Sequence, residues 1–292
     1  MGWRAAGALD PGVSDVSESD DIPVSRRLRF LAERTPDAGP PLPDALVAVF
    51  DALERWRRSA PIRYAGFPGR PIERAPANVS RYLAAVQRTE QAGEIAPVRF
   101  SSDERAARLD VFAGEDRRCF GAVQTVWLTL PSAGPALELG AIMQMAAEVC
   151  VAFGAHEGRL EDERALTAIY GSSARQRAAA QLPEALLEYL PDPTAGQPSL
   201  GIELLPPTQI DTRVVPAGIG WVSVWSQRQV EELGRARVEH AQWARVAPAD
   251  GFLVLALTPH PTNIDDPPDA QRLREVLEAL DLAAVQRRHR CT

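Results

Sequence analysis

Histidines and paired carboxylates are the residues of this chain whose types and spacing could support chemistry. None of the four histidines stands four residues from another histidine or from a cysteine, so no zinc-ligand pair of the usual spacing is present. His156 follows the end of an expected helix, where we expect a surface histidine. His260 lies between two prolines just past an expected strand. That position could host an active site, but no nucleophile accompanies it, and we expect a turn residue.

Acidic residues cluster at positions 17–21, at Glu161-Asp162-Glu163 and at Asp265-Asp266. Paired carboxylates can bind metal ions or share a proton. The last pair directly precedes an expected helix, so we expect it to cap that helix. No Gly-x-Ser-x-Gly motif occurs, and Gly218-Ile219-Gly220 continues into a strand instead of opening a helix. Neither a nucleophile elbow nor a phosphate loop is therefore predicted.

The charge composition excludes further classes of function. All 32 cationic residues are arginines, because the chain contains no lysine. This excludes a Schiff-base lysine, a phosphate-loop lysine and a Ser–Lys dyad. The net charge of −7 does not fit a nucleic-acid-binding surface, although it would attract a basic partner. We therefore expect a protein that is not an enzyme and that uses no catalytic residue, cofactor, metal or nucleic acid.

Cysteine usage and the apolar segments bear on the compartment. The odd number of cysteines and the absence of a Cys-x-x-Cys pair predict incidental thiols in a reducing cytosol instead of a disulfide framework. The N-terminal residues contain no apolar run of signal-peptide length, and residues 137–154 carry two glutamates, so no membrane span is expected. We predict a cytoplasmic protein. The three cysteines are Cys119, Cys150 and Cys291.

Apolar periodicity predicts a mixture of strands and helices without regular alternation. The fold class expected is α+β, with a mostly antiparallel sheet and helices packed on its faces. A hairpin turn is expected at Gly114-Glu115-Asp116. Expected strands cover 26–32, 62–66, 97–100, 107–112, 119–130, 218–226 and 252–258. Expected helices cover 43–58, 77–92, 136–153, 160–168, 174–189, 228–234 and 269–280.

The domain organisation follows from composition. Residues 1–24 are rich in Gly, Ser and Asp and poor in large apolar side chains, so we expect a disordered or loosely attached tail. Residues 25–284 are predicted to form a single domain. A division into two lobes, 25–190 and 191–284, stays open.

Tryptophans supply the candidates for burial and for contact. Trp221 and Trp225 are four residues apart, so on a regular strand they share one face, and we expect both in the core. Trp243 stands in a charged segment and is the better candidate for an exposed aromatic contact. Together with Arg235 and Arg237 it forms the predicted partner-binding set.

The C-terminal part has a recognisable pattern. A Gly-Trp-x-x-x-Trp-Ser strand from Gly220 is followed by a short helix, by the strand Gly251-Phe252-Leu253-Val254-Leu255 and by an Asn263-x-Asp265 turn before a last helix. This order resembles bacterial immunity proteins of polymorphic toxin systems, of the immunity protein 52 kind. The resemblance extends over residues 26–281 and leaves out the first 24 residues. It carries no catalytic residues onto this chain.

The resemblance implies a cytoplasmic protein that binds and neutralises a cognate toxin, delivered by contact-dependent or type VI secretion, through direct protein contact. The acidic balance would steer such a protein toward a basic toxin. Two alternatives stay open: a small enzyme with a site assembled from scattered Asp, His and Arg residues, and a structural component of a secretion assembly. The sequence leaves the oligomeric state undetermined.

Overall fold

The structure is a computed structural model, and it describes residues 28–57, 62–65, 71–72, 77, 79–80, 98–102, 110–130, 138–162, 202, 204–263 and 266–291. The predicted tail and the predicted helix at 174–189 lie outside these residues. The described strands are β1 (Leu28–Arg34), β2 (Ile62–Ala65), β3 (Pro71–Ile72), β4 (Val98–Ser102), β5 (Asp110–Arg118), β6 (Gly121–Leu130), β7 (Glu157–Asp162), β8 (Val222–Ser226), β9 (Arg245–Ala249) and β10 (Phe252–Ala256). The described helices are α1 (Leu42–Arg57), α3 (Leu139–Phe153), α6 (Gln227–Leu233), α7 (Arg235–His240), α8 (Pro267–Leu280) and α9 (Leu282–Arg288), with a 3-10 turn, η3 (Pro207–Gln209).

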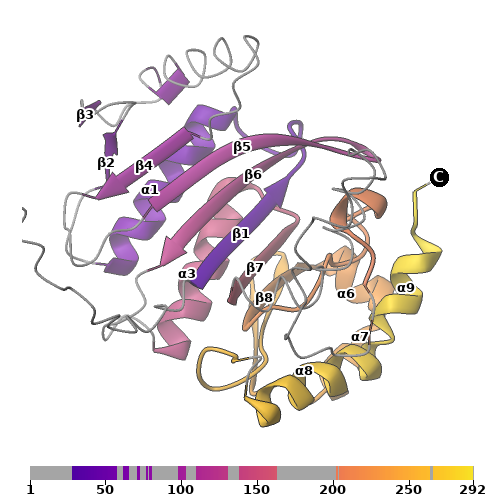
Figure 1. Ribbon diagram of the computed structural model, residues 1–292. Helices are drawn as coiled ribbons and strands as arrows, with labels where there is room; N and C mark the ends of the chain where they lie inside the picture. Colours follow the sequence, from indigo (N-terminus) through magenta and orange to yellow (C-terminus); the bar gives the residue numbers. More distant parts are fainter. Residues whose placement is uncertain are drawn as a thin grey trace, which may run out of the picture.

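The described strands form one antiparallel sheet, and helices pack on both of its faces (Figure 1). The strand order is β3-β2-β4-β5-β6-β1-β7-β8-β10-β9. Strand β1 comes first in the chain but lies in the middle of the sheet, between β6 and β7. The predicted α+β class with a mostly antiparallel sheet is therefore confirmed.

The first face of the sheet is apolar and is covered by α1 and α3. Phe30 of β1 is fully buried in one apolar cluster with residues of both helices, such as Phe50 and Val149. The helix α1 presents its apolar residues at three- and four-residue spacing, which makes one continuous buried stripe. Full burial of each such side chain stabilises the fold by about 1.5–3 kcal/mol.

Two glycines let α3 lie close to the sheet. Gly154 ends the helix with a left-handed φ of 68°, which a residue with a side chain rarely adopts. Gly158 then lies in β7 beneath the helix, and a Cβ there would stand 2.3 Å from the Sγ of Cys150. Any larger residue at Gly158 would push α3 away from β7.

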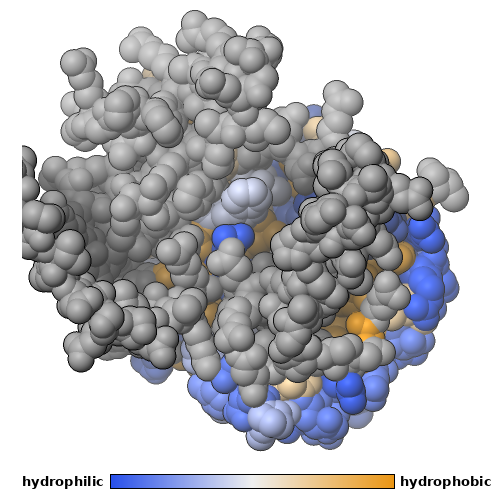
Figure 2. All heavy atoms as spheres, in the orientation of Figure 1, coloured by the Kyte–Doolittle hydropathy of each residue, from blue (hydrophilic) through white to orange (hydrophobic). Residues whose placement is uncertain are grey.

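The second face is covered by the C-terminal helices and by an irregular stretch, residues 204–220, which we name the crossing segment. Trp225 of β8 and Leu255 of β10 belong here to a second apolar cluster with α8 and α9. The outer surface of this part of the molecule is mostly hydrophilic (Figure 2). The two clusters therefore sandwich the β8–β10 part of the sheet between helices.

Several local predictions are wrong. Residues Gly114–Asp116 do not turn, because they pair with Thr125, Gln124 and Val123 inside the β5–β6 ladder, and the turn lies at Cys119 and Phe120. Residues 160–162 belong to β7, in the middle of the sheet, and not to a helix. Strand β9 and helix α9 were not predicted.

The burial of the two tryptophans is confirmed, but their shared face is wrong. Trp221 and Trp225 are 1% and 0% exposed. Trp221 belongs to the cluster on the first face, whereas Trp225 belongs to the cluster on the second. Strand β8 begins only at Val222, so strand alternation does not fix the direction of Trp221.

Cysteine pairing is a further correction. Cys119, in the turn between β5 and β6, forms a disulfide with Cys291, although 172 residues separate them, and their Cα atoms are 5.8 Å apart. Cys150 is a buried free thiol, and burial raises its pKa strongly. The expected reduced thiols are thus contradicted for one pair, because the fold joins two distant parts of the chain. Among the described helices, none has the length and apolar content needed to cross a bilayer.

Candidate functional site

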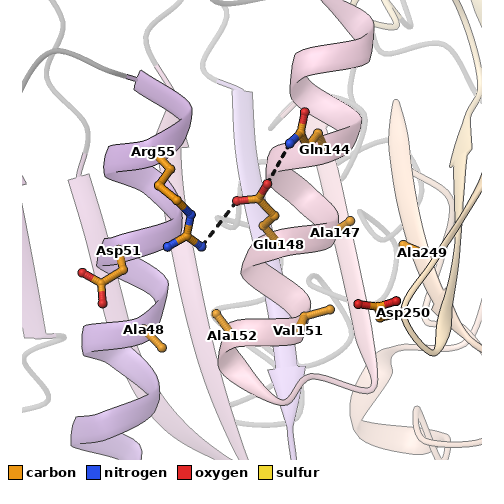
Figure 3. Close-up of a pocket in the computed structure, with 10 residues that line it drawn as sticks. All are labelled: Ala48, Asp51, Arg55, Gln144, Ala147, Glu148, Val151, Ala152, Ala249 and Asp250. Carbon is orange, nitrogen blue, oxygen red and sulfur yellow. Dashed lines mark hydrogen bonds and ion pairs between the residues drawn. The ribbon is translucent and has the colours of Figure 1, made fainter.

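The outer side of α3 forms an open trough, which we name the α3 trough. It has a volume of about 490 Å³ and runs across α3 from α1 to the turn between β9 and β10 (Figure 3). Ala147 and Val151 of α3 are among its apolar lining residues, and Val151 is 48% exposed. The helix α3 is apolar around most of its circumference, and among the described elements the sheet and α1 are the ones that pack against it. Its third side therefore offers apolar surface to a ligand or partner.

Charged groups rim the α3 trough and leave it acidic. Arg55 of α1 and Glu148 of α3 point toward one another and form an ion pair of 3.5 Å, and Gln144 donates to the same carboxylate at 2.8 Å (Figure 3). Asp51 and Asp250 are further lining residues. Three carboxylates against one guanidinium favour a cationic ligand.

A charged layer lies beneath the crossing segment on the second face. It consists of Glu33 of β1 with Glu157, Arg159 and Glu161 of β7, each at most 4% exposed. Arg159 pairs with both neighbours on its strand, with Nη1 3.2 Å from Glu157 and Nε 2.9 Å from Glu161. Alternation on a central strand points these side chains away from α3, toward the second face.

The charged layer ties the crossing segment to the sheet. The backbone N–H of Ala217 donates to both oxygens of Glu157 at 3.1 Å. The hydroxyl of Thr212 donates to Glu33 at 3.2 Å, and Arg118 donates to the other oxygen of Glu33 at 2.6 Å. Each buried carboxylate thus has donors, which offset the cost of removing it from water.

Burial shifts the protonation of this layer. It raises the pKa of Glu157 to about 8, although the nearby guanidinium of Arg159 and the N–H of Ala217 lower it. It raises the pKa of Glu161 to about 7, again against Arg159. His156, predicted at the surface, has a side chain only 13% exposed, and burial lowers its pKa to about 4. Because Glu33, Glu157, Arg159 and Glu161 are each at most 4% exposed, we assign the layer a structural role.

A second recess, the Trp243 recess, lies beside the start of α8. Its volume is about 620 Å³, and Trp243, His260, Asp269 and Arg272 are among its lining residues. Trp243 is only partly exposed, because its ring makes a T-shaped contact with the ring of Trp225, with the ring centroids 5.6 Å apart, and its Nε1 donates to the carbonyl of Val238 at 2.8 Å. The structure thus brings together Trp243 and His260, which the sequence suggested separately.

The two arginines of the predicted partner-binding set lie apart from that recess. Arg237 donates to the carbonyl of Leu280 at 3.2 Å, in the last turn of α8. Arg235 pairs with Glu239 one turn along α7 at 3.5 Å. The Arg237 contact joins α7 to α8, whereas the Arg235 ion pair lies within α7 on exposed side chains. Neither residue lines the α3 trough or the Trp243 recess. Their proposed role in binding stays a prediction.

Sequence reasoning missed the α3 trough. The sequence shows that four residues of α3 share one helix face, because they are three or four residues apart: Gln144, Ala147, Glu148 and Val151. The sequence does not show that this face is exposed among the described elements, because the cover of a helix depends on tertiary packing.

Comparisons with known proteins add little. No protein-family model and no curated protein matches the chain. Among solved structures, the Pseudomonas aeruginosa T6SS protein PA0821 is 14% identical, with a TM-score of 0.48, over 88% of this chain and 76% of that chain. A likeness this distant carries no argument about function, and the resemblance to immunity proteins stays a prediction.

Proposed function

We propose that this protein is an immunity protein that binds and neutralises a basic bacterial toxin through the α3 trough. The observation that carries the proposal is the apolar face of α3, with Val151 48% exposed, which no other described element covers and which lies between acidic side chains. The sequence pattern of residues 220–265 supports the class of partner, and the net charge of −7 supports its basic character.

The geometry suits an extended basic side chain. A Lys or Arg from the toxin would lay its methylene stem across Ala147 and Val151 and set its charge against Glu148 or Asp250. The trough would hold one such anchor within a larger contact of roughly 1,200–2,000 Å². Binding of this kind needs no catalytic group, since covering the active site of the toxin is sufficient for inhibition.

The test combines rescue of cells with a change in the trough. If a toxin gene neighbours this gene, cells that express that toxin should survive when they also produce the wild-type protein. The double variant Val151→Arg and Asp250→Arg places positive charge in the trough and should weaken complex formation at least about tenfold. Both side chains are exposed, so the fold should be preserved.

A matched control keeps the total charge change equal. The variant Val246→Arg with Glu278→Arg also alters an exposed valine and an exposed carboxylate, but outside the trough. It should rescue cells and form the complex like the wild type. The proposal fails if the wild-type protein forms no complex with the toxin, or if the trough and control variants bind equally. Sedimentation of the protein only in a large particle would favour the alternative of a structural component.

A further inference from the structure

Beyond partner binding, we propose that His260, Asp266 and Asp269 bind one divalent metal ion of the zinc class at the edge of the Trp243 recess, which His260 and Asp269 line. Within the described part of the chain, each of these residues offers one ligand atom, and the three atoms all lie within 4.8 Å of one another. The site is built where β10 ends and α8 begins, and it shares no residue with the α3 trough.

The carboxylate of Asp269 is oriented so that one oxygen faces the proposed metal position. Its side chain is only 5% exposed, and its Oδ2 accepts the backbone N–H of Asn263 at 2.7 Å. Its other oxygen, Oδ1, faces the Nε2 of His260 at 3.4 Å. One oxygen therefore orients the carboxylate while the second is directed at the imidazole, as in carboxylates that hold metals.

The distance between these two atoms suits a shared ion better than a direct hydrogen bond. A good N–H···O bond measures about 2.7–3.2 Å. Two ligands that each lie about 2.0–2.1 Å from one zinc ion at the tetrahedral angle stand about 3.3–3.4 Å apart. The observed 3.4 Å agrees with the second geometry.

Asp266 is not used by the helix whose start it marks. It occupies the N-cap position of α8, as predicted, but its side chain makes no capping hydrogen bond, and Asp265 lies outside the described residues. His260 has a side chain 60% exposed, which leaves a route for an ion from solvent. The two carboxylates together carry a charge of −2, which balances the charge of a divalent metal ion. The imidazole supplies a third ligand, and a fourth coordination position is left for water.

Positive groups near the site limit its strength without excluding it. The start of α8 carries a partial positive charge, which disfavours a cation. Arg272 lines the same recess, but it hydrogen-bonds to Gln242 and lies 3.6 Å from the carboxylate of Glu275. Its charge is thus partly neutralised, and we expect binding weaker than at a structural zinc site.

The test is calorimetric titration of the full chain with Zn²⁺ after treatment with a chelator. The wild-type protein should bind one ion per chain, and its unfolding temperature should rise with Zn²⁺. His260→Ala and Asp266→Asn should each weaken binding at least about tenfold. Neither change removes a buried side chain, so both variants should fold, which circular dichroism would check.

His240→Ala is the matched control. His240 is an exposed histidine in the last turn of α7, outside the proposed ligand set, and its removal should leave the affinity unchanged. The proposal is overturned if the wild-type protein binds no Zn²⁺. It is also overturned if His260→Ala binds as tightly as His240→Ala, since the three residues would then form only an ion pair and a helix start.

Discussion

The two faces of the sheet are stabilised in different ways. On the first face, apolar side chains of α1 and α3 meet apolar side chains of the strands, with Phe30 and Phe50 both fully buried. On the second face, buried carboxylates of β1 and β7 meet a crossing segment that has almost no regular structure, and a disulfide joins Cys119 to Cys291. An apolar face needs only patterned helices to cover it, whereas buried charges need donors at specific positions.

That difference explains where prediction succeeded. The periodic spacing of apolar residues predicts helices that cover an apolar face of a sheet. For α1 the predicted ends differ from the observed ends by one residue each. A strand of alternating Glu and Arg resembles a solvated segment unless its partners are known. The burial of Glu157 depends on Ala217, which lies 60 residues away in sequence.

The largest effect is expected when a tryptophan is removed from either cluster. Trp221→Ala and Trp225→Ala should each lower the free energy of unfolding by about 3–5 kcal/mol. The loss in free energy of unfolding should be about 1 kcal/mol larger for Trp221→Ala, because the Nε1 of Trp221 donates to the carbonyl of Thr258 at 2.9 Å. Urea denaturation measures both, with the exposed Val151→Ala as a control expected within about 0.5 kcal/mol of wild type. An unchanged midpoint for Trp221→Ala would show that it is not a core residue.

The second prediction concerns the second face alone. Reduction of the Cys119–Cys291 disulfide should destabilise the protein by about 2–5 kcal/mol, because the bond closes a loop spanning 172 residues. Urea denaturation with and without dithiothreitol measures the loss. The variant Cys119→Ser with Cys291→Ser should show no effect of the reductant. Denatured, unreduced protein should react as one thiol, from Cys150; three reactive thiols would restore the expectation of a fully reduced chain.

The smallest effect should be a pH dependence that comes from the charged layer. A carboxyl with a folded pKa above its unfolded value contributes stability at low pH and loses it as pH rises through the folded pKa. Burial raises the pKa of Glu157 from 4.5 to about 8 and that of Glu161 from 4.5 to about 7, so their contribution is lost progressively as the pH rises from the unfolded value to the folded one. The wild-type protein should therefore lose stability between pH 6.5 and 8, and its stability should level off by pH 9. His156 contributes little there, since its shifted window lies between pH 4 and 6.5.

Glu157→Gln removes one of the two titrations and should flatten this slope, as urea midpoints at pH 6.5, 7, 8 and 9 would measure. The exposed Glu278→Gln is the control and should keep the wild-type slope. A wild-type stability that rises with pH over this range, or equal slopes in wild type and Glu157→Gln, would contradict the buried carboxyl as the cause. The same variants leave the first face untouched and therefore separate the two faces.

Part of the candidate sites was open to prediction. His260 was noticed because it follows a strand between two prolines, and Trp243 because it is aromatic in a charged segment. Their meeting in one recess was not predicted, since the 16 residues between them in sequence include strands β9 and β10 and the connecting turns. The uncovered side of α3 was likewise missed, because a sequence records which residues could be buried and not which ones find a partner.

The sequence alone predicted the α+β class, the helices α1 and α3 that cover the first face, and the burial of Trp221 and Trp225. It also excluded lysine chemistry. Tertiary structure decided which face each tryptophan occupies, that β7 lies in the middle of the sheet, and that Cys119 meets Cys291. The physical reason is how far apart in sequence the contacting residues lie. Periodicity of apolar residues reflects packing of single helices and strands, whereas pairing of charges, thiols and ligand atoms depends on which distant segments the fold brings within a few ångströms.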